Sequence, residues 1–298
     1  MRLAYYPGCT LKTRARSLEE PALASMEVLG FKLEEVRRWN CCGGVYSLAD
    51  DDLIHHVAPV RNLIRVKKSG NDNLVTLCSF CFNTLKRANL LMKENVEKRD
   101  TINRFIEEDV EYKGEVEVLH LLEVLRDKVG WKDLARQVRF PLKELKAAPY
   151  YGCTLVRPRQ VAIDRSESPL ILHEFLKSIG AIPVDFSEST RCCGSYQILH
   201  DRSFILDCSA DIVSSARDAG AEILVITCPL CEYNLCQGQK DLAQRRSDFI
   251  QMPVVYFTQL LALSLALNPK VCHFELNSCS PESLLREKNL LRQDAIGG

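Results

Sequence analysis

The chain has no excess of charge of either sign. Its 298 residues include 39 lysines and arginines and 39 aspartates and glutamates. Because proteins that bind nucleic acids usually carry a basic excess, this balance argues against a nucleic acid as the partner. The charge-rich run 93–109 predicts a solvated helical face rather than a binding patch.

A long hydrophobic run is also missing. The longest apolar stretch, residues 254–267, is interrupted by polar side chains and is shorter than the ~20 residues that span a bilayer. The N-terminal segment that leads to Cys9 has no apolar core of the kind found in signal peptides. We therefore expect a cytoplasmic chain that is not integral to the membrane. In that reducing setting, cysteines serve as ligands or redox groups rather than as cross-links.

Nucleotide-binding motifs are absent as well. The sequence contains neither a GxGxxG nor a Walker A pattern, so we expect no nucleotide or flavin bound by this chain. Its six histidines do not cluster. His55 and His56 share one predicted helix, while His120 and His173 open or line others, and we expect surface or capping roles for them. His120 occupies the same place in the predicted element order as Thr258, so a role in a crevice stays open.

Cysteine, in contrast, is abundant and patterned. Ten of the 14 cysteines form two copies of one arrangement, spaced C-x31-CC-x35-C-x2-C and C-x38-CC-x34-C-x2-C. The flanking residues repeat too, since Tyr5-Tyr6-Pro7-Gly8 precedes the first copy and Tyr150-Tyr151-Gly152 precedes the second. Five thiols in each half, duplicated with their neighbours, are hard to explain by packing alone. The two sets are Cys9, Cys41, Cys42, Cys78 and Cys81, and Cys153, Cys192, Cys193, Cys228 and Cys231.

Short apolar runs alternate with amphipathic segments in both halves. This alternation predicts an α/β fold of two pseudo-symmetric, Rossmann-like βα halves with largely parallel sheets. Two of the predicted helices end at Gly30 and Gly180. We expect a first repeat over 1–145, a second over 146–267 and a C-terminal tail over 268–298. Strands are expected at 3–6, 73–77, 116–119, 222–227 and 254–257, and helices at 18–29, 53–66, 120–125, 170–179, 204–219 and 259–263.

The patterned cysteines follow predicted strands. Cys9, Cys78 and Cys228 come at or just after a strand end, and Cys153 follows a short segment that begins at Pro149. Ligands of open parallel sheets bind at the carboxyl ends of the strands. We therefore expect the three cysteine groups of each half to meet at one sheet edge. The glycines after each adjacent pair would let the backbone approach a bulky inorganic core.

Several chemistries are open to these thiols. Four thiolates satisfy a zinc ion, so zinc at one or both sites is an alternative. Each copy offers five thiols, however, and an adjacent pair such as Cys41-Cys42 suits a larger cluster better than one tetrahedral ion. A thioredoxin-like dithiol at Cys228-Pro229-Leu230-Cys231 would leave eight patterned cysteines unexplained. Core packing is the expected role of the remaining four, Cys208, Cys236, Cys272 and Cys279.

The ten-cysteine pattern resembles the cysteine-rich CCG domain. The doubled form without a fused ferredoxin is similar to the B-type chain of heterodisulfide reductase (HdrB), over residues 1–267. The resemblance implies a catalytic subunit that reduces a small-molecule disulfide, of the coenzyme M–coenzyme B kind, to two thiols by one-electron steps. It also implies two noncubane [4Fe-4S] clusters, one bound by Cys9, Cys41, Cys42, Cys78 and Cys81 and the other by Cys153, Cys192, Cys193, Cys228 and Cys231.

The same resemblance implies partners. Because the chain has no cubane-cluster motif, electrons would come from an HdrC-like subunit with two cubane [4Fe-4S] clusters, fed by a flavin-containing, electron-bifurcating HdrA-like subunit. One alternative is an electron-transfer subunit that passes electrons to a quinone or a partner enzyme, and another is a zinc-binding scaffold. Basic residues near the motifs could offset the charge of the thiolates or bind an anionic substrate. They are Lys12, Arg14, Arg157, Arg159 and Arg191.

Overall fold

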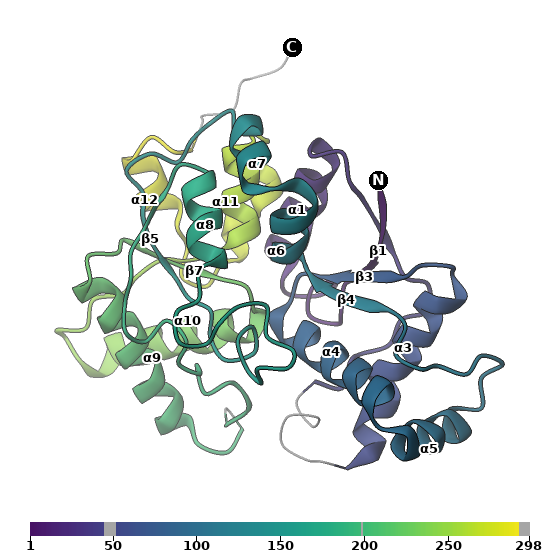
Figure 1. The fold of residues 1–298 in the computed structure, drawn as a ribbon. Helices are drawn as coiled ribbons and strands as arrows, with labels where there is room; N and C mark the ends of the chain where they lie inside the picture. Colours follow the sequence, from purple (N-terminus) through teal and green to yellow (C-terminus); the bar gives the residue numbers. More distant parts are fainter. Residues whose placement is uncertain (45–51, 198, 292–298) are drawn as a thin grey trace.

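The computed structural model describes residues 1–44, 52–197 and 199–291. In this part, the chain forms two four-stranded parallel sheets, with strand orders β2-β1-β3-β4 and β6-β5-β7-β8 (Figure 1). The predicted α/β class with two pseudo-symmetric halves is confirmed. The predicted limits of the repeats and the tail stay a prediction, and the tail's last seven residues lie outside the described part.

The first half alternates strands with helices. The structure places strands within two residues of each range expected from the sequence, places α5 inside the expected helical run 93–109, and adds β2, α4 and α7. The elements are β1 (Arg2–Tyr6), α1 (Arg16–Val28), β2 (Lys32–Glu35), η1 (Leu53–His56), α3 (Val57–Lys68), β3 (Asn73–Thr76), α4 (Ser79–Glu94), α5 (Val96–Ile106), β4 (Glu117–His120), α6 (Leu121–Val124), the π-helical turn η2 (Leu125–Val129) and α7 (Trp131–Gln137).

The second half repeats this order of strands and is followed by short helical segments. Its elements are β5 (Lys146–Pro149), α8 (Ile171–Ser178), β6 (Ile182–Pro183), η3 (Ser195–Gln197), α9 (Arg202–Asp218), β7 (Ile223–Ile226), α10 (Pro229–Arg245), β8 (Val254–Tyr256), α11 (Phe257–Ser264), η4 (Pro269–Cys272), η5 (Phe274–Leu276) and α12 (Glu282–Glu287).

Gly30 and Gly180 end equivalent helices in the two halves, as predicted. Both have a positive φ, +82° and +83°, which a residue with a Cβ adopts only at a cost. The amide after each glycine donates back into the helix, from Phe31 to the Met26 carbonyl and from Ala181 to the Leu176 carbonyl. These bonds satisfy helix-end carbonyls and turn the chain into β2 and β6.

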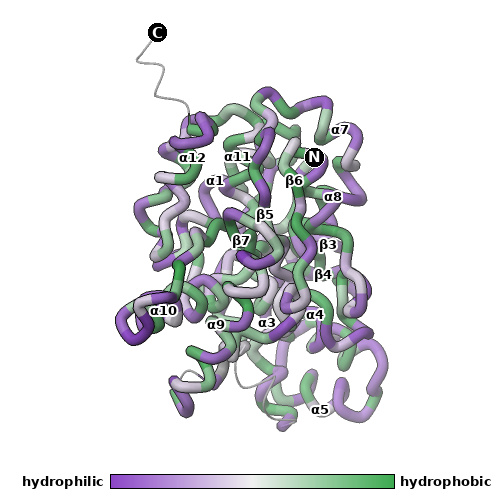
Figure 2. Tube along the Cα trace, turned by 90° about the vertical axis from the view of Figure 1, so that its left-hand side faces the viewer, coloured by the Kyte–Doolittle hydropathy of each residue, from purple (hydrophilic) through white to green (hydrophobic). Residues whose placement is uncertain are grey.

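The inner strands of both sheets lie among helices (Figure 2), whereas β2 and β6 at the sheet edges are partly exposed. All four residues of β7 are buried, as expected of a strand covered on both faces. The halves also share a core, because α1 of the first packs against α11 of the second. There the Thr258 hydroxyl donates to the Leu18 carbonyl at 2.9 Å. The molecule is therefore one packed unit with two sheets.

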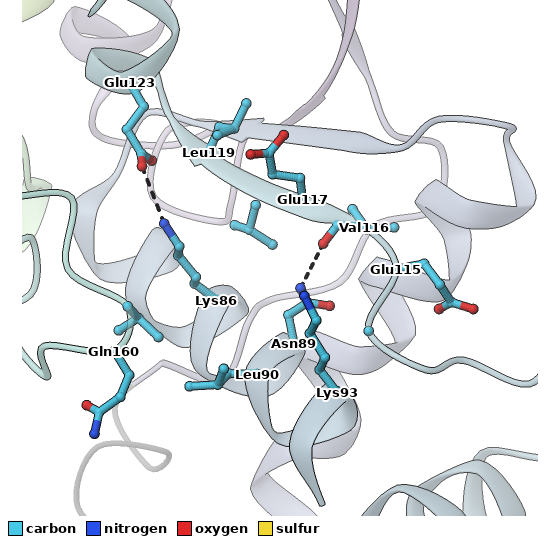
Figure 3. A pocket seen from close by; sticks show the side chains of 13 residues that line it. Lys86, Asn89, Leu90, Lys93, Glu115, Val116, Glu117, Leu119, Glu123 and Gln160 are labelled. Carbon is cyan, nitrogen blue, oxygen red and sulfur yellow. Dashed lines mark hydrogen bonds and ion pairs between the residues drawn. The ribbon is translucent and has the colours of Figure 1, made fainter. Parts of the chain in front are cut away.

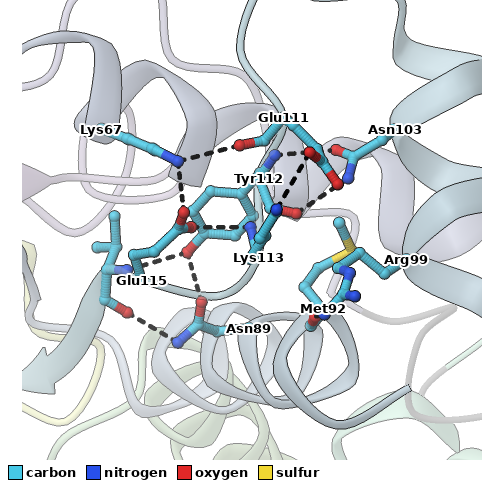
Figure 4. A network of polar contacts seen from close by, with 10 residues as sticks. Lys67, Asn89, Met92, Arg99, Asn103, Glu111, Tyr112, Lys113 and Glu115 are labelled. Atoms are coloured by element: carbon cyan, nitrogen blue, oxygen red, sulfur yellow. Dashed lines mark hydrogen bonds and ion pairs between the residues drawn. The ribbon is translucent and has the colours of Figure 1, made fainter. Parts of the chain in front are cut away.

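The loop between α5 and β4 is held by buried polar contacts (Figure 4). Asn103 exchanges two hydrogen bonds with the Tyr112 backbone, at 3.0 and 3.2 Å. The buried Tyr112 hydroxyl donates to Asn89 of α4, and Lys67 of α3 pairs with Glu115. These contacts fix β4 as the outer strand beside β3.

Each sheet has a topological switch point at its first strand. β1 pairs with β2 on one side and with β3 on the other, and β5 pairs with β6 and β7 in the same way. Chains leaving the carboxyl ends of β1 and β3 therefore diverge and leave a crevice between them. Cys9 follows β1 and Cys78 follows β3, so this crevice receives the first cysteine set. No helix in residues 1–44, 52–197 and 199–291 is long and apolar enough to cross a bilayer.

Candidate metal centre

The first cysteine set gathers at the crevice of the first sheet. The Cys9 and Cys41 sulfurs lie 3.7 Å apart, and the Cys42 and Cys81 sulfurs lie 3.6 Å apart. Cys78 is the N-cap residue of α4, and Cys81 lies in the first turn of that helix. Cys9 and Cys41 are exposed, whereas Cys42 and Cys78 are buried. The set therefore extends from the protein interior to its surface.

The second set repeats the same pairing. The Cys153 and Cys192 sulfurs lie 3.6 Å apart, and those of Cys193 and Cys231 lie 3.5 Å apart. Cys228 caps α10 as Cys78 caps α4. The carboxamide of Asn234 donates to the carbonyl and the sulfur of Cys193, at 3.3 and 3.6 Å. The structure thus brings together at each sheet edge the five cysteines predicted from the spacing.

The two sets touch each other. The Cys78 and Cys228 thiols lie near each other at the boundary between the halves, because Cys228 raises the pKa of Cys78 and Cys78 helps to lower that of Cys228. Beside them, the Ser79 amide donates to the Thr227 carbonyl at 3.3 Å, and the Asn83 carboxamide donates to the Thr154 carbonyl at 2.8 Å. The ten thiols therefore form two adjoining sites at the centre of the molecule.

Contacts among the thiols favour ionisation of particular sulfurs. Hydrogen bonds from Cys41 and Cys81 hold the pKa of Cys42 well below its usual value. In the second set, hydrogen bonds from Cys153 and Cys193 lower the pKa of Cys192 to about 2. The thiolate is the form of cysteine that binds metals. Each site therefore contains a sulfur that is already favoured as a thiolate.

A cavity of about 670 Å³ opens beside the first set. One wall carries Thr10, Thr13 and Arg14, which follow Cys9. The opposite wall comes from the second half and the C-terminal segment, and it is largely apolar. The lining residues of that wall and of the floor are Phe80, Pro229, Leu230, Glu232, Tyr233, Tyr256, Leu276 and Ser278. The counterparts of the exposed Cys9 and Cys41, namely Cys153 and Cys192, are only half-exposed.

The arrangement of the thiols suits several metal atoms better than one ion. In each set, four of the five sulfurs stand in two close pairs, and the glycines before and after them leave room. A Cβ on Gly8, for example, would lie 3.0 Å from the Cys81 sulfur. Five thiols set out in this way fit a polynuclear iron–sulfur cluster, whose usual protein ligands are cysteine thiolates.

Comparison with known proteins identifies the family. The family model of the cysteine-rich domain named CCG matches residues 3–86 and 147–236, which together make up more than half of the chain. The chain belongs to the CCG family. Both CCG matches contain a complete set of five cysteines, so the family predicted from the cysteine pattern is confirmed.

Two curated relatives cover nearly the whole CCG chain. It is 32% identical to the 8-methylmenaquinol:fumarate reductase membrane anchor subunit of Wolinella succinogenes, over 90% of this chain and 93% of that one. It is 27% identical to the B-type chain of the ferredoxin/F(420)H(2)-dependent CoB-CoM heterodisulfide reductase of Methanosarcina acetivorans, over 93% of each chain. The similarity to HdrB, expected from the cysteines, is thereby confirmed.

A solved structure shares the fold of this CCG chain. A hypothetical protein from Helicobacter pylori superposes with a TM-score of 0.75 at 16% sequence identity. The match covers 94% of this chain but 52% of that one, so the CCG chain spans about half of its structural neighbour. At this identity the likeness concerns the fold alone.

The basic residues near the CCG motifs divide into two groups. Lys12 pairs with Glu19 and Glu35, both at 2.7 Å, and Arg191 pairs with Glu188 and Asp211. Arg157 donates to the Thr190 carbonyl at 3.2 Å. Arg14 faces the cavity, and no acidic partner is found for it in the described part of the chain. Arg14 is therefore the cation placed to meet an anionic ligand, whereas Arg159, which is exposed like Arg14, does not line the cavity.

A second hollow, about 400 Å³, lies between α4 and β4 and contains no cysteine (Figure 3). Three of its charged residues, Lys86, Glu115 and Glu123, are engaged in ion pairs. Lys86 lies 3.3 Å from Glu123 and 4.6 Å from the centre of the Phe82 ring. Asn89 donates to the Val116 carbonyl at 2.7 Å. These contacts assign the hollow a structural role at the edge of the first sheet.

The histidines differ in part from the sequence prediction. His120 does cap a helix, since its Nδ1 accepts from the Leu122 amide at 3.2 Å. A surface position is wrong for His120 and for His173, because both are buried. The predicted match of His120 with Thr258 is also wrong. By strand register and capping box, His120 corresponds to Tyr256, which caps α11 and lines the cavity.

Other CCG residues at the site were not identified from the sequence. Tyr6 and Tyr150 lie among the thiols, and the repeat of these tyrosines beside the cysteines is the signal that could have identified them. Phe80, Tyr233 and Leu276 line the cavity because two distant segments meet there. No local pattern marks these three residues.

Proposed function

We propose that this CCG protein is the catalytic iron–sulfur subunit of a heterodisulfide reductase-like complex. Each five-cysteine set would hold one noncubane [4Fe-4S] cluster, and a small-molecule disulfide would be reduced to two thiols. The contact between Cys78 and Cys228 carries the proposal, because it makes two otherwise separate metal sites neighbours. When bound, the two clusters would each supply one electron for cleavage of the S–S bond.

The cavity beside the first set supports a substrate there. Its apolar wall, which includes Phe80 and Leu230, excludes water from a bound disulfide. On the opposite wall, Arg14 and the hydroxyls of Thr10 and Thr13 would orient an anionic end group. These residues would hold the S–S bond close to the exposed sulfurs of Cys9 and Cys41.

The proposal includes a cytoplasmic complex. Electrons would reach this chain from an HdrC-like subunit with cubane clusters, which a flavin-containing HdrA-like subunit supplies through electron bifurcation. The name of the Methanosarcina acetivorans relative, the B-type chain of a ferredoxin-dependent heterodisulfide reductase, supports partners of this kind. Co-purification of the tagged chain from its native host would test them, and a chain isolated without any iron–sulfur or flavin partner would contradict them.

Metal analysis of anaerobically purified protein tests the cofactor. We expect about four irons per cysteine set, whereas stoichiometric zinc with little iron would contradict the proposal. Cys193→Ala should lose the second cluster and abolish reduction of an added mixed disulfide. Cys272→Ala is the matched control, since Cys272 is equally buried but lies outside the pattern. Turnover that persists in Cys193→Ala would show that the second site is dispensable.

A second candidate is an electron-transfer subunit that delivers electrons to a quinone. The name of the Wolinella succinogenes relative, a menaquinol:fumarate reductase subunit, favours it, as does the apolar wall of the cavity. The two candidates differ in their response to ligands. A mixed disulfide that changes the cluster EPR signal of the reduced protein supports the first. A change produced by a short-chain menaquinone analogue instead supports the second.

A further inference from the structure

Two buried tyrosines occupy equivalent positions beside the two sets of thiols. The Tyr6 hydroxyl donates to the Asn40 carbonyl at 2.9 Å, and the Tyr150 hydroxyl donates to the Arg191 carbonyl at 2.7 Å. Asn40 and Arg191 each directly precede the adjacent cysteine pair. Both tyrosines are almost fully buried, with exposed fractions of 0% and 1%. The two halves thus repeat a bond that anchors the start of each pair.

The phenol rings stand among the sulfurs. Burial raises the pKa of Tyr6, and so does the charge of the neighbouring sulfurs, Cys81 foremost. Burial and the charge of Cys193 likewise raise the pKa of Tyr150. Each hydroxyl donates to a backbone carbonyl, which can only accept, so the direction of each hydrogen bond is fixed. A Cβ on Gly8 would lie 3.4 Å from the Tyr6 ring, and a Cβ on Gly152 would lie 3.4 Å from the Tyr150 ring. The glycine before the first cysteine of each set therefore packs closely against the tyrosine ring.

We propose that Tyr6 and Tyr150 are positioning residues for the two metal sites. Each hydroxyl holds the backbone carbonyl of the residue before the cysteine pair, Asn40 or Arg191. The position of that carbonyl in turn determines the positions of the two thiols in the pair. The inference rests on the proposed function in so far as these thiols hold iron–sulfur clusters. Neither tyrosine is required to exchange protons or electrons.

The two anchors differ in strength. The Asn40 carbonyl also accepts a hydrogen bond from the Asn62 carboxamide, at 2.9 Å. Ile212 occupies the corresponding place in α9, at the same sequence distance before Cys228 as Asn62 before Cys78. In the described part of the chain, the Arg191 carbonyl accepts from Tyr150 alone. The second site therefore depends on its tyrosine more than the first.

Tyrosine-to-phenylalanine variants of the full chain test the proposal. Tyr150→Phe should change the EPR signature and midpoint potential of one cluster, or lower the iron content by up to half. Tyr6→Phe should have a smaller effect, and Tyr6→Phe combined with Asn62→Leu should approach that of Tyr150→Phe. Tyr5→Phe and Tyr151→Phe are the matched controls. Their hydroxyls are equally buried but bond to Glu19 and to the Pro169 carbonyl, both at 3.0 Å.

The controls separate positioning from general destabilisation. Thermal unfolding should respond to all four single variants, whereas the EPR signature and the potential should respond to Tyr6→Phe and Tyr150→Phe only. A Tyr150→Phe protein with the spectra and potential of the wild type would overturn the proposal. So would a spectral change as large in Tyr151→Phe.

The wild-type metal content distinguishes this proposal from the proposed function. If the wild-type protein binds zinc rather than iron, the disulfide reductase proposal fails, and the anchors are tested by zinc release to a chelator. Release should then be several-fold faster from Tyr150→Phe than from Tyr151→Phe. Equal rates would overturn the positioning role.

Discussion

The thiols of Cys78 and Cys228 lie near enough to shift each other's pKa, although the strands before them belong to different sheets. Each residue also caps a long helix, α4 or α10, so the N-termini of both helices converge on this contact. The partial positive charge of a helix N-terminus stabilises a nearby thiolate. Negative charge is therefore favoured at Cys228, whose pKa is held well below its usual value by Cys231 and Cys78.

We expect substitution of Cys78 to affect both sites. In Cys78→Ser, the potential and EPR signal of the second-site cluster should change together with those of the first. Cys9→Ser is the control, because Cys9 is exposed at the far end of the same set. Its effect should be confined to the first site. Redox titration monitored by EPR measures both, and identical spectra for the second site in the two variants would contradict the expected coupling.

Arg14 should bind the anionic end of a substrate. Arg14→Gln should raise KM for an anionic disulfide about threefold to tenfold, as expected for loss of one charge-assisted hydrogen bond at an exposed site. kcat should change little, because Arg14 does not contact the thiols. Arg159→Gln, at an exposed position outside the cavity, should leave both constants unaltered. An equal change in KM for a neutral disulfide would rule out recognition of charge.

Gly44 and Phe80 form a matched pair in the first site. A Cβ on Gly44 would lie 2.3 Å from a Phe80 ring carbon. Ser195 corresponds to Gly44 in the second site, and Leu230 corresponds to Phe80. The second site thus has a larger residue in place of the glycine and a smaller one in place of the phenylalanine. Gly44→Ala should therefore displace the ring into the cavity and destabilise the protein by about 1–3 kcal/mol. Adding Phe80→Leu should restore most of that stability.

Denaturant unfolding of the single and double variants measures this compensation. Iron content should follow the same order, with Gly44→Ala lowest. If Phe80→Leu adds its own loss of stability to that of Gly44→Ala, the proposed steric pairing is wrong.

His120 should make stability depend on pH in the acidic range. Burial lowers the pKa of His120 from 6.5 to about 3 and outweighs the opposite effect of the Leu77 carbonyl, which lies 2.9 Å from Nε2. The unfolded chain binds this proton below pH 6.5 and the folded chain does not. The stabilisation is therefore complete above pH 6.5 and is lost as pH falls towards 3, by up to about 1.4 kcal/mol per pH unit.

Unfolding free energies measured between pH 5 and 7 check this dependence. His120→Asn keeps a capping side chain but does not titrate, so its slope should be shallower than that of the wild type. His200→Asn, at an exposed position, should retain the wild-type slope. Parallel curves for the wild type and His120→Asn would contradict the assignment.

The parts of the fold that were predictable have local causes. β7 is a run of β-branched and leucine residues, and Gly30 and Gly180 take a backbone conformation that glycine favours. The cysteine sets could be located because parallel strands bring their carboxyl ends together. β2 and β6 were not predicted. Both are short and partly exposed, and pairing with β1 and β5 holds them rather than their own sequence.

The features that escaped prediction depend on contacts between distant segments. The burial of His120 results from packing against Phe82 and Phe257, at ring-centroid distances of 5.8 Å. The cavity forms where the start of α10 and the segment around Leu276 face Cys9. The hydroxyl of Tyr6 finds the Asn40 carbonyl only once both are folded. The spacing of residues along the sequence does not show which distant segments come into contact.

The packing of α1 on α11 limits how the gene for this protein can be divided during evolution. A duplicated gene can usually be divided again, because each copy makes a module that covers its own apolar surface. Here α1 carries the fully buried side chains of Leu18, Ala22 and Met26, and the helix lies against the other half. A recombination event that parted the halves would expose this surface in one product and the α11 surface in the other. Natural selection therefore acts on the two halves together.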